Sequence, residues 1–177
     1  LKARSKEDTF NDAYKTKEQA TVPGQSARVI VTTTKEKGVD GKERVRALKT
    51  SEFFARATPT APGIFVRALG DTFTSGVYGS VGGNSGFIIT PIENYERALG
   101  GILSWEPKMW PDLSLLLLSQ VPYGAQFTDK TITGVRARVF GSGEDALVYG
   151  FIDKKVLLIV RGEGSFGVLA DMIRAPK

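Results

Sequence analysis

Short runs of β-branched and aromatic residues, separated by turns rich in glycine, proline and charge, predict that strands outnumber helices in this chain. The predicted strands are 27–34, 71–79, 87–90, 131–140, 146–152 and 156–160. Two of the connections are short enough for β-hairpins, a glycine-rich turn at 80–86 and a turn around Asp153 and Lys154. Hairpins imply antiparallel pairing, so an antiparallel sheet is expected.

Helices are predicted where apolar residues recur every three or four positions. They are expected at 50–57, 94–105, 112–119 and 166–173, while 64–70 fits either a strand or a helix. Thr50 or Ser51 is the expected N-cap of the first helix. Pro107 and Pro111 are expected to bracket a connection between the second and third helices. The third contains four consecutive leucines, so it is expected to be buried on nearly all sides.

One pattern occurs twice along the chain. Val77–Leu103 and Val148–Ile173 both begin with Val-Tyr-Gly and both run strand, turn, strand, loop and helix. The repeat predicts an α+β fold in which an antiparallel sheet, built from two similar ββα units, carries its helices on one face.

The chain has 177 residues, which suits a single domain with its own hydrophobic core. We expect this domain to span 27–177, with related halves at about 27–113 and 114–177. Residues 1–26 are polar and lack apolar periodicity, so they are expected to form a polar basic tail or stalk.

The net charge of +5 is unevenly placed along the chain. Residues 1–50 hold 12 Lys and Arg against 7 Asp and Glu, whereas residues 51–177 hold 12 of each. The basic residues are interrupted by acids and lack interleaved aromatics, so nucleic acid is not an expected partner.

The chain contains neither cysteine nor histidine. Disulfides, thiolate or imidazole metal sites, and Ser-His-Asp or Cys-His catalysis are therefore excluded within it. Carboxylate acid–base chemistry, Ser-Lys pairs and oxygen-ligated metals remain open. No cofactor is expected.

Gly162–Gly167 matches the G-x-G-x-x-G pattern of dinucleotide-binding loops and follows a predicted strand. Such a loop needs a further strand and an acidic residue about 20 positions later, but the chain ends 10 residues after Gly167. In the first copy of the repeat the same position is Pro91–Asn94, which has no glycine. We therefore interpret 162–167 as a strand-to-helix turn.

The remaining candidates for chemistry are isolated. Ser85 lies in a Gly-Asn-Ser-Gly run, where no histidine exists to activate it, and a flexible turn is the simpler interpretation. Carboxylates considered for a metal or acid–base site are Glu93, Glu96, Glu106, Asp112 and Asp129. Glu93 and Glu96 are more simply explained as a solvated first turn that complements the helix dipole.

Aromatic and basic residues are the candidates for partner contact. Tyr95, Trp105 and Met109 are expected to pack between helices, whereas Trp110, followed directly by proline, is expected to be exposed. Lys130, Arg136 and Arg138 are expected to form a small basic stripe on one strand, although protection of an edge strand would explain them equally well. Trp110, Arg136 and Arg138 are thus the candidate partner-contact residues.

Four segments carry a resemblance to a known family: 70–79, 84–113, 127–129 and 146–160. They include the pattern Trp105-Glu106-x-x-Met109-x-x-Asp112-Leu113. In these segments the chain resembles uncharacterised membrane-anchored proteins of candidate-phyla (Patescibacteria-type) bacteria, over about residues 27–175. The resemblance implies one N-terminal transmembrane helix followed by an extracytoplasmic domain. Such a helix is not visible here, so we expect it to have been removed ahead of Leu1.

The function expected from these observations is a non-enzymatic, extracytoplasmic binding or scaffold domain tethered to the cell membrane. Its expected partners are an envelope protein or a second copy of itself, with the membrane reached through the missing anchor. The alternative is a subunit of an envelope assembly of the pilus, secretion or surface-layer type. A carboxylate-based enzyme is the least favoured hypothesis.

Overall fold

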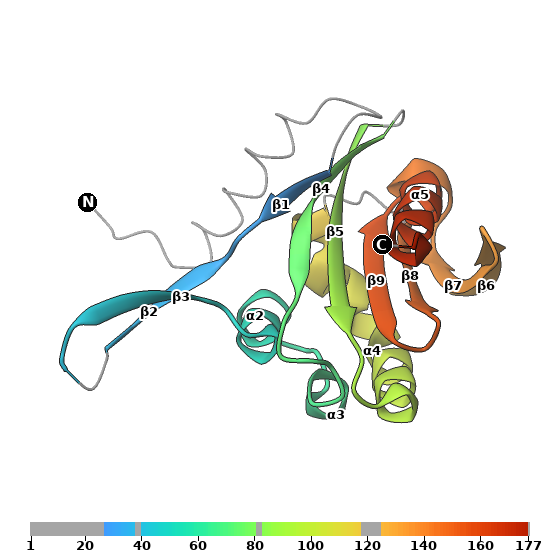
Figure 1. The fold of residues 1–177 in the computed structure, drawn as a ribbon. Helices are drawn as coiled ribbons and strands as arrows, with labels where there is room; N and C mark the ends of the chain where they lie inside the picture. Colours follow the sequence, from blue (N-terminus) through green and yellow to red (C-terminus); the bar gives the residue numbers. More distant parts are fainter. Residues whose placement is uncertain (1–26, 38–39, 81–82, 118–124, 177) are drawn as a thin grey trace, which may run out of the picture.

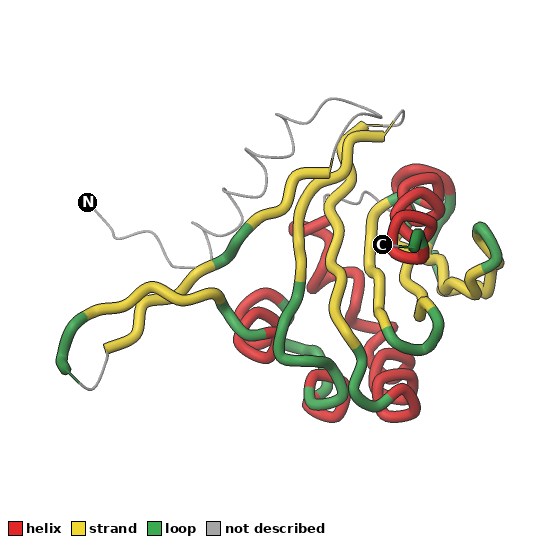
Figure 2. Tube along the Cα trace, viewed as in Figure 1, coloured by secondary structure: helices red, strands yellow, loops and turns green. Residues whose placement is uncertain are grey.

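A computed structural model of the chain describes residues 27–37, 40–80, 83–117 and 125–176. The described residues form a seven-stranded antiparallel sheet, a separate two-stranded sheet and four α-helices, as Figures 1 and 2 show. The predicted α+β class with an antiparallel sheet is confirmed. The predicted tail at 1–26 lies outside the described residues.

The large sheet has the strand order β1-β4-β5-β9-β8-β7-β6. Its strands are β1 (Ala27–Ile30), β4 (Thr74–Ser80), β5 (Gly83–Pro91), β6 (Phe127–Ile132), β7 (Val135–Phe140), β8 (Leu147–Ile152) and β9 (Val156–Arg161). The small sheet pairs β2 (Thr33–Lys37) with β3 (Glu43–Ala47). The helices are α2 (Thr50–Ala57), α3 (Gly63–Val66), α4 (Tyr95–Leu117) and α5 (Glu163–Arg174), and a 3-10 turn η1 spans Gly143–Asp145.

The two predicted hairpins are present and lie side by side, because β5 pairs with β9. Asp153 and Lys154 make the turn between β8 and β9 with left-handed backbone angles, φ 50° and 57°. The predicted strand 131–140 is wrong in part, since it is two strands joined by a turn at Thr133 and Gly134. The predicted turn at 80–86 is also wrong in part, because β5 already begins at Gly83.

The helices cover both faces of the sheet, so the expectation of helices on one face is wrong. Leu157 and Ile159 of β9 pack in the core beneath α2, α3 and α4, whereas Leu158 and Val160 pack beneath α5. Figure 1 shows α4 and α5 on opposite sides of the sheet. The reason is visible in β9, whose uninterrupted apolar run has a side chain to bury on each face.

Helix α4 is continuous, so the predicted connection between Pro107 and Pro111 is wrong. Each proline removes one backbone N–H from the helix ladder, but both are exposed while Trp105, Met109 and Leu113 are buried on the other side. Burial of that side holds the helix together across the missing bonds. The expected division between halves at 113 and 114 falls inside this helix.

Helix α4 is also fastened at Asp112. Its Oδ2 accepts hydrogen bonds from Thr60 Oγ1 at 2.6 Å, from Thr60 N at 3.2 Å and from Trp105 Nε1 at 3.0 Å. This candidate carboxylate therefore ties the turn between α2 and α3 to α4.

The N-terminal part of the described chain differs from its prediction in two places. The single strand expected at 27–34 is divided, because β1 pairs with β4 of the large sheet while β2 pairs with β3. We call residues 31–37 and 40–47 the arm, and Figures 1 and 2 show it projecting away from the body of the domain. Helix α2 spans Thr50–Ala57 as expected, but its N-cap is Lys49 and not Thr50 or Ser51, and the backbone N–H of Lys49 donates to Glu52 Oε2 at 2.9 Å. The ambiguous segment 64–70 starts as the short helix α3.

Candidate functional site

A charged contact joins α4 to the large sheet. Glu106 on α4 accepts two hydrogen bonds from Arg138 on β7, one from Nε to Oε1 and one from Nη2 to Oε2, both at 2.7 Å. The hydroxyl of Tyr149 on β8 donates to Glu106 Oε1 at 2.6 Å. Strand register explains why Arg138 and Tyr149 lie together, because the pairing of β7 with β8 places them directly opposite each other.

The three side chains are largely shielded from water. The side chain of Glu106 is 13% exposed and that of Arg138 is 25% exposed. Burial raises the pKa of Tyr149 above its ordinary range, and its hydrogen bond to Glu106 adds to the effect. The hydrogen bonds to Glu106 likewise raise the pKa of Arg138. At neutral pH Tyr149 is therefore a neutral phenol and Arg138 a guanidinium.

Half-buried aromatic rings surround this contact on the same face of the sheet. We call them the aromatic row; its members are Tyr95, Trp110, Phe127, Phe140 and Phe151. Neighbouring ring centroids are 5.0 Å apart for Phe127–Phe140, 5.2 Å for Tyr95–Phe151, 5.7 Å for Phe127–Tyr149, 6.4 Å for Trp110–Phe140 and 6.5 Å for Tyr149–Phe151. These contacts make one continuous series of rings, with Tyr149 as its buried centre.

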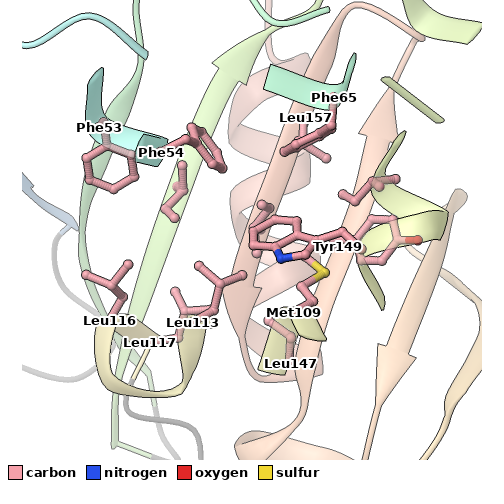
Figure 3. Close-up of a cluster of buried hydrophobic side chains, with 14 of the residues drawn as sticks. Phe53, Phe54, Phe65, Met109, Leu113, Leu116, Leu117, Leu147, Tyr149 and Leu157 are labelled. Atoms are coloured by element: carbon pink, nitrogen blue, oxygen red, sulfur yellow. The ribbon is translucent and has the colours of Figure 1, made fainter. Parts of the chain in front are cut away.

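Cations lie against the row at two points. The guanidinium carbon of Arg138 is 5.8 Å from the ring centroid of Phe127, and Lys154 Nζ is 4.9 Å from that of Tyr95. Figure 3 shows Tyr149 beside the buried cluster, with its hydroxyl pointing away from Met109. The row is therefore the margin of the hydrophobic core, where apolar rings meet charge.

The predicted partner-contact residues have three different environments. Trp110 is half-buried, not exposed, and its indole Nε1 is buried without an acceptor among the described residues. Arg136 is exposed as expected. Arg138 is not a free surface cation, because Glu106 holds it.

The predicted basic stripe does not exist as one surface. Lys130 pairs in register with Ala137, which packs in the core beneath α5, so Lys130 lies on that face and contacts Glu163. Arg136 and Arg138 alternate with Ala137 and therefore lie on the opposite face. The three cations are divided between the two sides of the sheet.

The glycines of 162–167 have packing roles. Gly162 is the N-cap of α5 with φ 87°, and a Cβ at Gly164 would lie 2.8 Å from Glu144 Oε1. The side chain of Glu163 contacts Lys130 and accepts the backbone N–H of Gly143 at 3.0 Å. The segment is a strand-to-helix turn, and its glycines admit close neighbours.

The predicted turn serine is part of the interior. Ser85 lies in β5 and is 2% exposed, and its Oγ accepts a hydrogen bond from the buried Ser165 Oγ at 2.9 Å. The pair links β5 to α5 beneath the surface.

The candidate carboxylates are not gathered into one site. Glu106 and Asp129 both contact Arg138, the latter at 3.4 Å from Nη1. Glu93 and Glu96 are exposed near the start of α4. Within the described ranges, no group of three or more acidic side chains is arranged to hold a metal ion.

Sequence reasoning missed most of the aromatic row. Tyr149, Phe151, Phe127 and Phe140 come from three strands, and only their pairing brings them together. One signal was available: Phe140 follows Arg136 and Arg138 at intervals of two, so it shares their face.

Among the helices that the structure describes, none combines the length and the apolar character that crossing a bilayer requires. Comparison of the chain with protein-family models, with curated proteins and with solved structures gives no match.

Proposed function

We propose that this chain is a non-enzymatic binding or scaffold domain of the bacterial cell envelope, held outside the cytoplasm by a membrane anchor, and that it contacts a partner protein through the aromatic row. The observation that carries the proposal is the row itself, a continuous series of half-buried rings around the contact of Arg138 with Glu106.

The composition of this surface supports a protein partner. Tyrosine, tryptophan and arginine are enriched where protein interfaces gain most of their binding energy. Trp110 and Tyr95 stand toward the two ends of the row, and exposed Arg136 lies on the same strand face as Phe140. A partner that covers the row would bury apolar ring surface and leave Arg136 available for a carboxylate.

The chemistry of the site supports binding over catalysis. A general acid or base must be free to exchange a proton with a substrate. Glu106 is instead occupied by three hydrogen bonds from Arg138 and Tyr149. Asp129 contacts the same guanidinium.

The proposed location is supported by the resemblance of residues 27–175 to membrane-anchored extracytoplasmic proteins. Protease treatment of intact cells and of lysed cells tests it directly. An extracytoplasmic domain should be digested once the outer layers are permeable, while a cytoplasmic control protein stays protected. Protection equal to that of the control would contradict the location.

Site-specific photo-crosslinking tests the proposed binding surface. A crosslinking amino acid at Arg136 reports on the face of the aromatic row, and one at Asp171, exposed on α5, reports on the opposite face. We expect a discrete adduct with another envelope protein from position 136 and none from position 171. The same adducts from both positions, or none from either, would refute the row as the binding surface.

The alternative is a subunit of an envelope assembly. The feature that favours it is the open large sheet, in which β1 and β6 are the outermost of the described strands, each paired with a described strand on one side only, so that a neighbouring strand could add to either edge. Light scattering over a wide range of protein concentration separates the two functions. Growth in mass with concentration supports assembly, and a constant monomer mass supports the binding domain.

A further inference from the structure

The most exposed large apolar side chains in the described part of the chain belong to the arm. Val31 is 73% exposed and Val45 is 66% exposed, the highest values among such residues. Isolated apolar side chains on a surface are ordinary, but these two belong to one projecting segment. Their arrangement on that segment shows what they can contact.

Strand register places Val45 on the same face of the arm as Thr33 and Lys35. Lys35 pairs with Val45, Thr33 pairs with Ala47, and cross-strand partners project to the same side. Val31 continues this side, because Ile30 is buried and Thr32 is half-buried while Val31 and Thr33 are exposed. We call this side the open face; its members are Val31, Thr33, Lys35, Lys37, Glu43, Val45 and Ala47.

The opposite face of the arm is already occupied by contacts within the chain. Arg46 Nε donates to Glu36 Oε2 at 2.6 Å, and its Nη1 and Nη2 donate to Glu52 of α2 at 2.7 and 2.6 Å. Arg44 contacts Asp40 at 3.1 Å. The arginines are thus paired with acids on one side, and the valines and lysines remain on the other.

The base of the arm is held to the body of the domain. Besides the bond of Arg46 to Glu52, the backbone N–H of Leu48 donates to Thr32 O at 2.9 Å. These contacts keep the arm in an extended pose that Figure 1 shows clear of the large sheet. Contact with an external surface then requires little further ordering of the hairpin.

The arm carries an excess of positive charge. It holds five Lys and Arg against three Asp and Glu, a net charge of +2, whereas 51–177 is neutral. On the open face Lys35 contacts Glu43 at 3.3 Å, and no acidic side chain of the described residues lies within 4.0 Å of Lys37. The arm therefore suits an anionic surface, and two arms of like charge would repel each other.

The composition of the open face separates a lipid surface from a protein partner. Protein interfaces are depleted in lysine and enriched in aromatic residues and arginine, as the aromatic row is. The open face combines lysines and aliphatic residues, and it has neither an aromatic residue nor an arginine. Interfacial segments use aliphatic residues that enter the headgroup region, and flanking lysines attract anionic lipids.

We propose that the open face of the arm lies on an anionic phospholipid surface, with Val31 and Val45 entering the headgroup region and Lys35 and Lys37 contacting lipid phosphates. This contact is separate from the aromatic row and stands whether or not the row binds a protein.

Co-sedimentation with vesicles tests the proposal. The full 177-residue chain is mixed with vesicles of phosphatidylglycerol and phosphatidylcholine in equal amounts, and with vesicles of phosphatidylcholine alone, in 0.1 M NaCl. We expect binding to the anionic vesicles only. The variant K35E/K37E should bind at least tenfold more weakly, since each lysine near an anionic surface contributes a factor of about five. The variant V31S/V45S should also bind several-fold more weakly.

The matched control is K108E/K155E, which makes the same change in net charge at two exposed lysines outside the arm. It should retain binding within about twofold, because charges farther than about 10 Å from the lipid are screened at this salt concentration. All the replaced side chains are exposed, so circular dichroism and the thermal midpoint should match those of the unmodified chain.

Three results would overturn the proposal. Binding that does not exceed that to phosphatidylcholine removes it outright. Equal weakening by K35E/K37E and K108E/K155E would assign binding to net charge and not to the arm. Binding to soluble poly-glutamate that depends on Lys35 and Lys37, without binding to vesicles, would assign the open face to an acidic protein.

Discussion

The contact of Glu106 with Arg138 gives the sharpest test of the structure. Replacing Arg138 by methionine keeps an unbranched apolar stem but removes the guanidinium, and it leaves the carboxylate of Glu106, 13% exposed, without its bidentate partner. Breaking a fully buried ion pair in this way costs about 3–5 kcal/mol. Because a quarter of Arg138 is exposed, we expect a loss of about 2–4 kcal/mol in the free energy of unfolding.

Urea unfolding measures this loss. With a slope of about 2 kcal/mol per molar urea, typical of small domains, a loss of about 3 kcal/mol lowers the midpoint by about 1.5 M. The matched control is Arg136→Met, two residues away on the same strand face but exposed. Its effect should stay within about 0.5 kcal/mol, as for most surface substitutions.

A double variant separates the unpaired charge from the lost packing. In Glu106→Gln with Arg138→Met a neutral amide replaces the charged carboxylate. The oxygen of this amide still accepts the hydrogen bond of Tyr149. Because an uncharged replacement of a buried pair is often close to neutral, the double variant should unfold within about 1 kcal/mol of the original chain. A double variant as unstable as Arg138→Met alone, or a single variant that loses less than about 0.5 kcal/mol, would refute the reasoning.

Three further outcomes follow from particular contacts. Gly101→Ala should lower the free energy of unfolding, measured with heat or urea, by about 1–3 kcal/mol, because its Cβ would lie 2.6–2.8 Å from atoms of α3. The control Gly100→Ala has nothing within 4 Å of its Cβ and should raise this free energy by about 0.5–1 kcal/mol. Similar values for the two variants would contradict the close approach of α3 and α4. Hydrogen bonds from the Arg46 side chain and the Lys49 backbone lower the pKa of Glu52 to about 2, so its support of the arm is complete above its ordinary value of 4.5 and is lost as pH falls through about 2. NMR shifts of the β3 amides should change over that range in the original chain and not in Glu52→Gln, and a midpoint near 4.5 would be the contrary result. Burial raises the pKa of Tyr149 above its ordinary value of 10.0, so stability from this group is present below pH 10.0 and falls as pH rises beyond it. This decline in stability should be smaller in Tyr149→Phe. Ionisation of Tyr149 near pH 10.0 in the folded chain, seen by ultraviolet titration, would disprove the raised pKa.

Local signals in the sequence determined the elements whose structure depends on near neighbours. The turn at Asp153 and Lys154 follows from two apolar runs that leave room for a short connection, and the structure has its hairpin there. The strand-to-helix turn at 162–167 follows from the repeat, since the same position in the first copy, Pro91–Asn94, has no glycine, and the structure starts α5 there. The α+β class followed from counting such elements.

The candidate site was predicted only in part, for a reason of distance along the chain. Trp110 and Arg138 were selected as single residues, but Glu106 and Tyr149 meet Arg138 across 32 and 11 positions. A sequence pattern gives the side of a strand on which a residue lies, and only the pairing of β7 with β8 gives its neighbours. The charge that appeared available for a partner was therefore already held within the fold.

Tertiary packing also decided where local rules did not apply. Pro107 and Pro111 are signals that end a helix, yet α4 continues through them because its other side is buried against the sheet. Residues 27–34 have one strand-like composition, yet they divide between two sheets because β4 is available to β1 and β3 to β2. The sequence by itself thus determined the kinds of element and the places of the tight turns, since these depend on backbone preferences within a few residues. Which faces are covered, which charges are paired and which valines remain exposed on the arm depend on contacts between distant segments, and only the tertiary structure decided them.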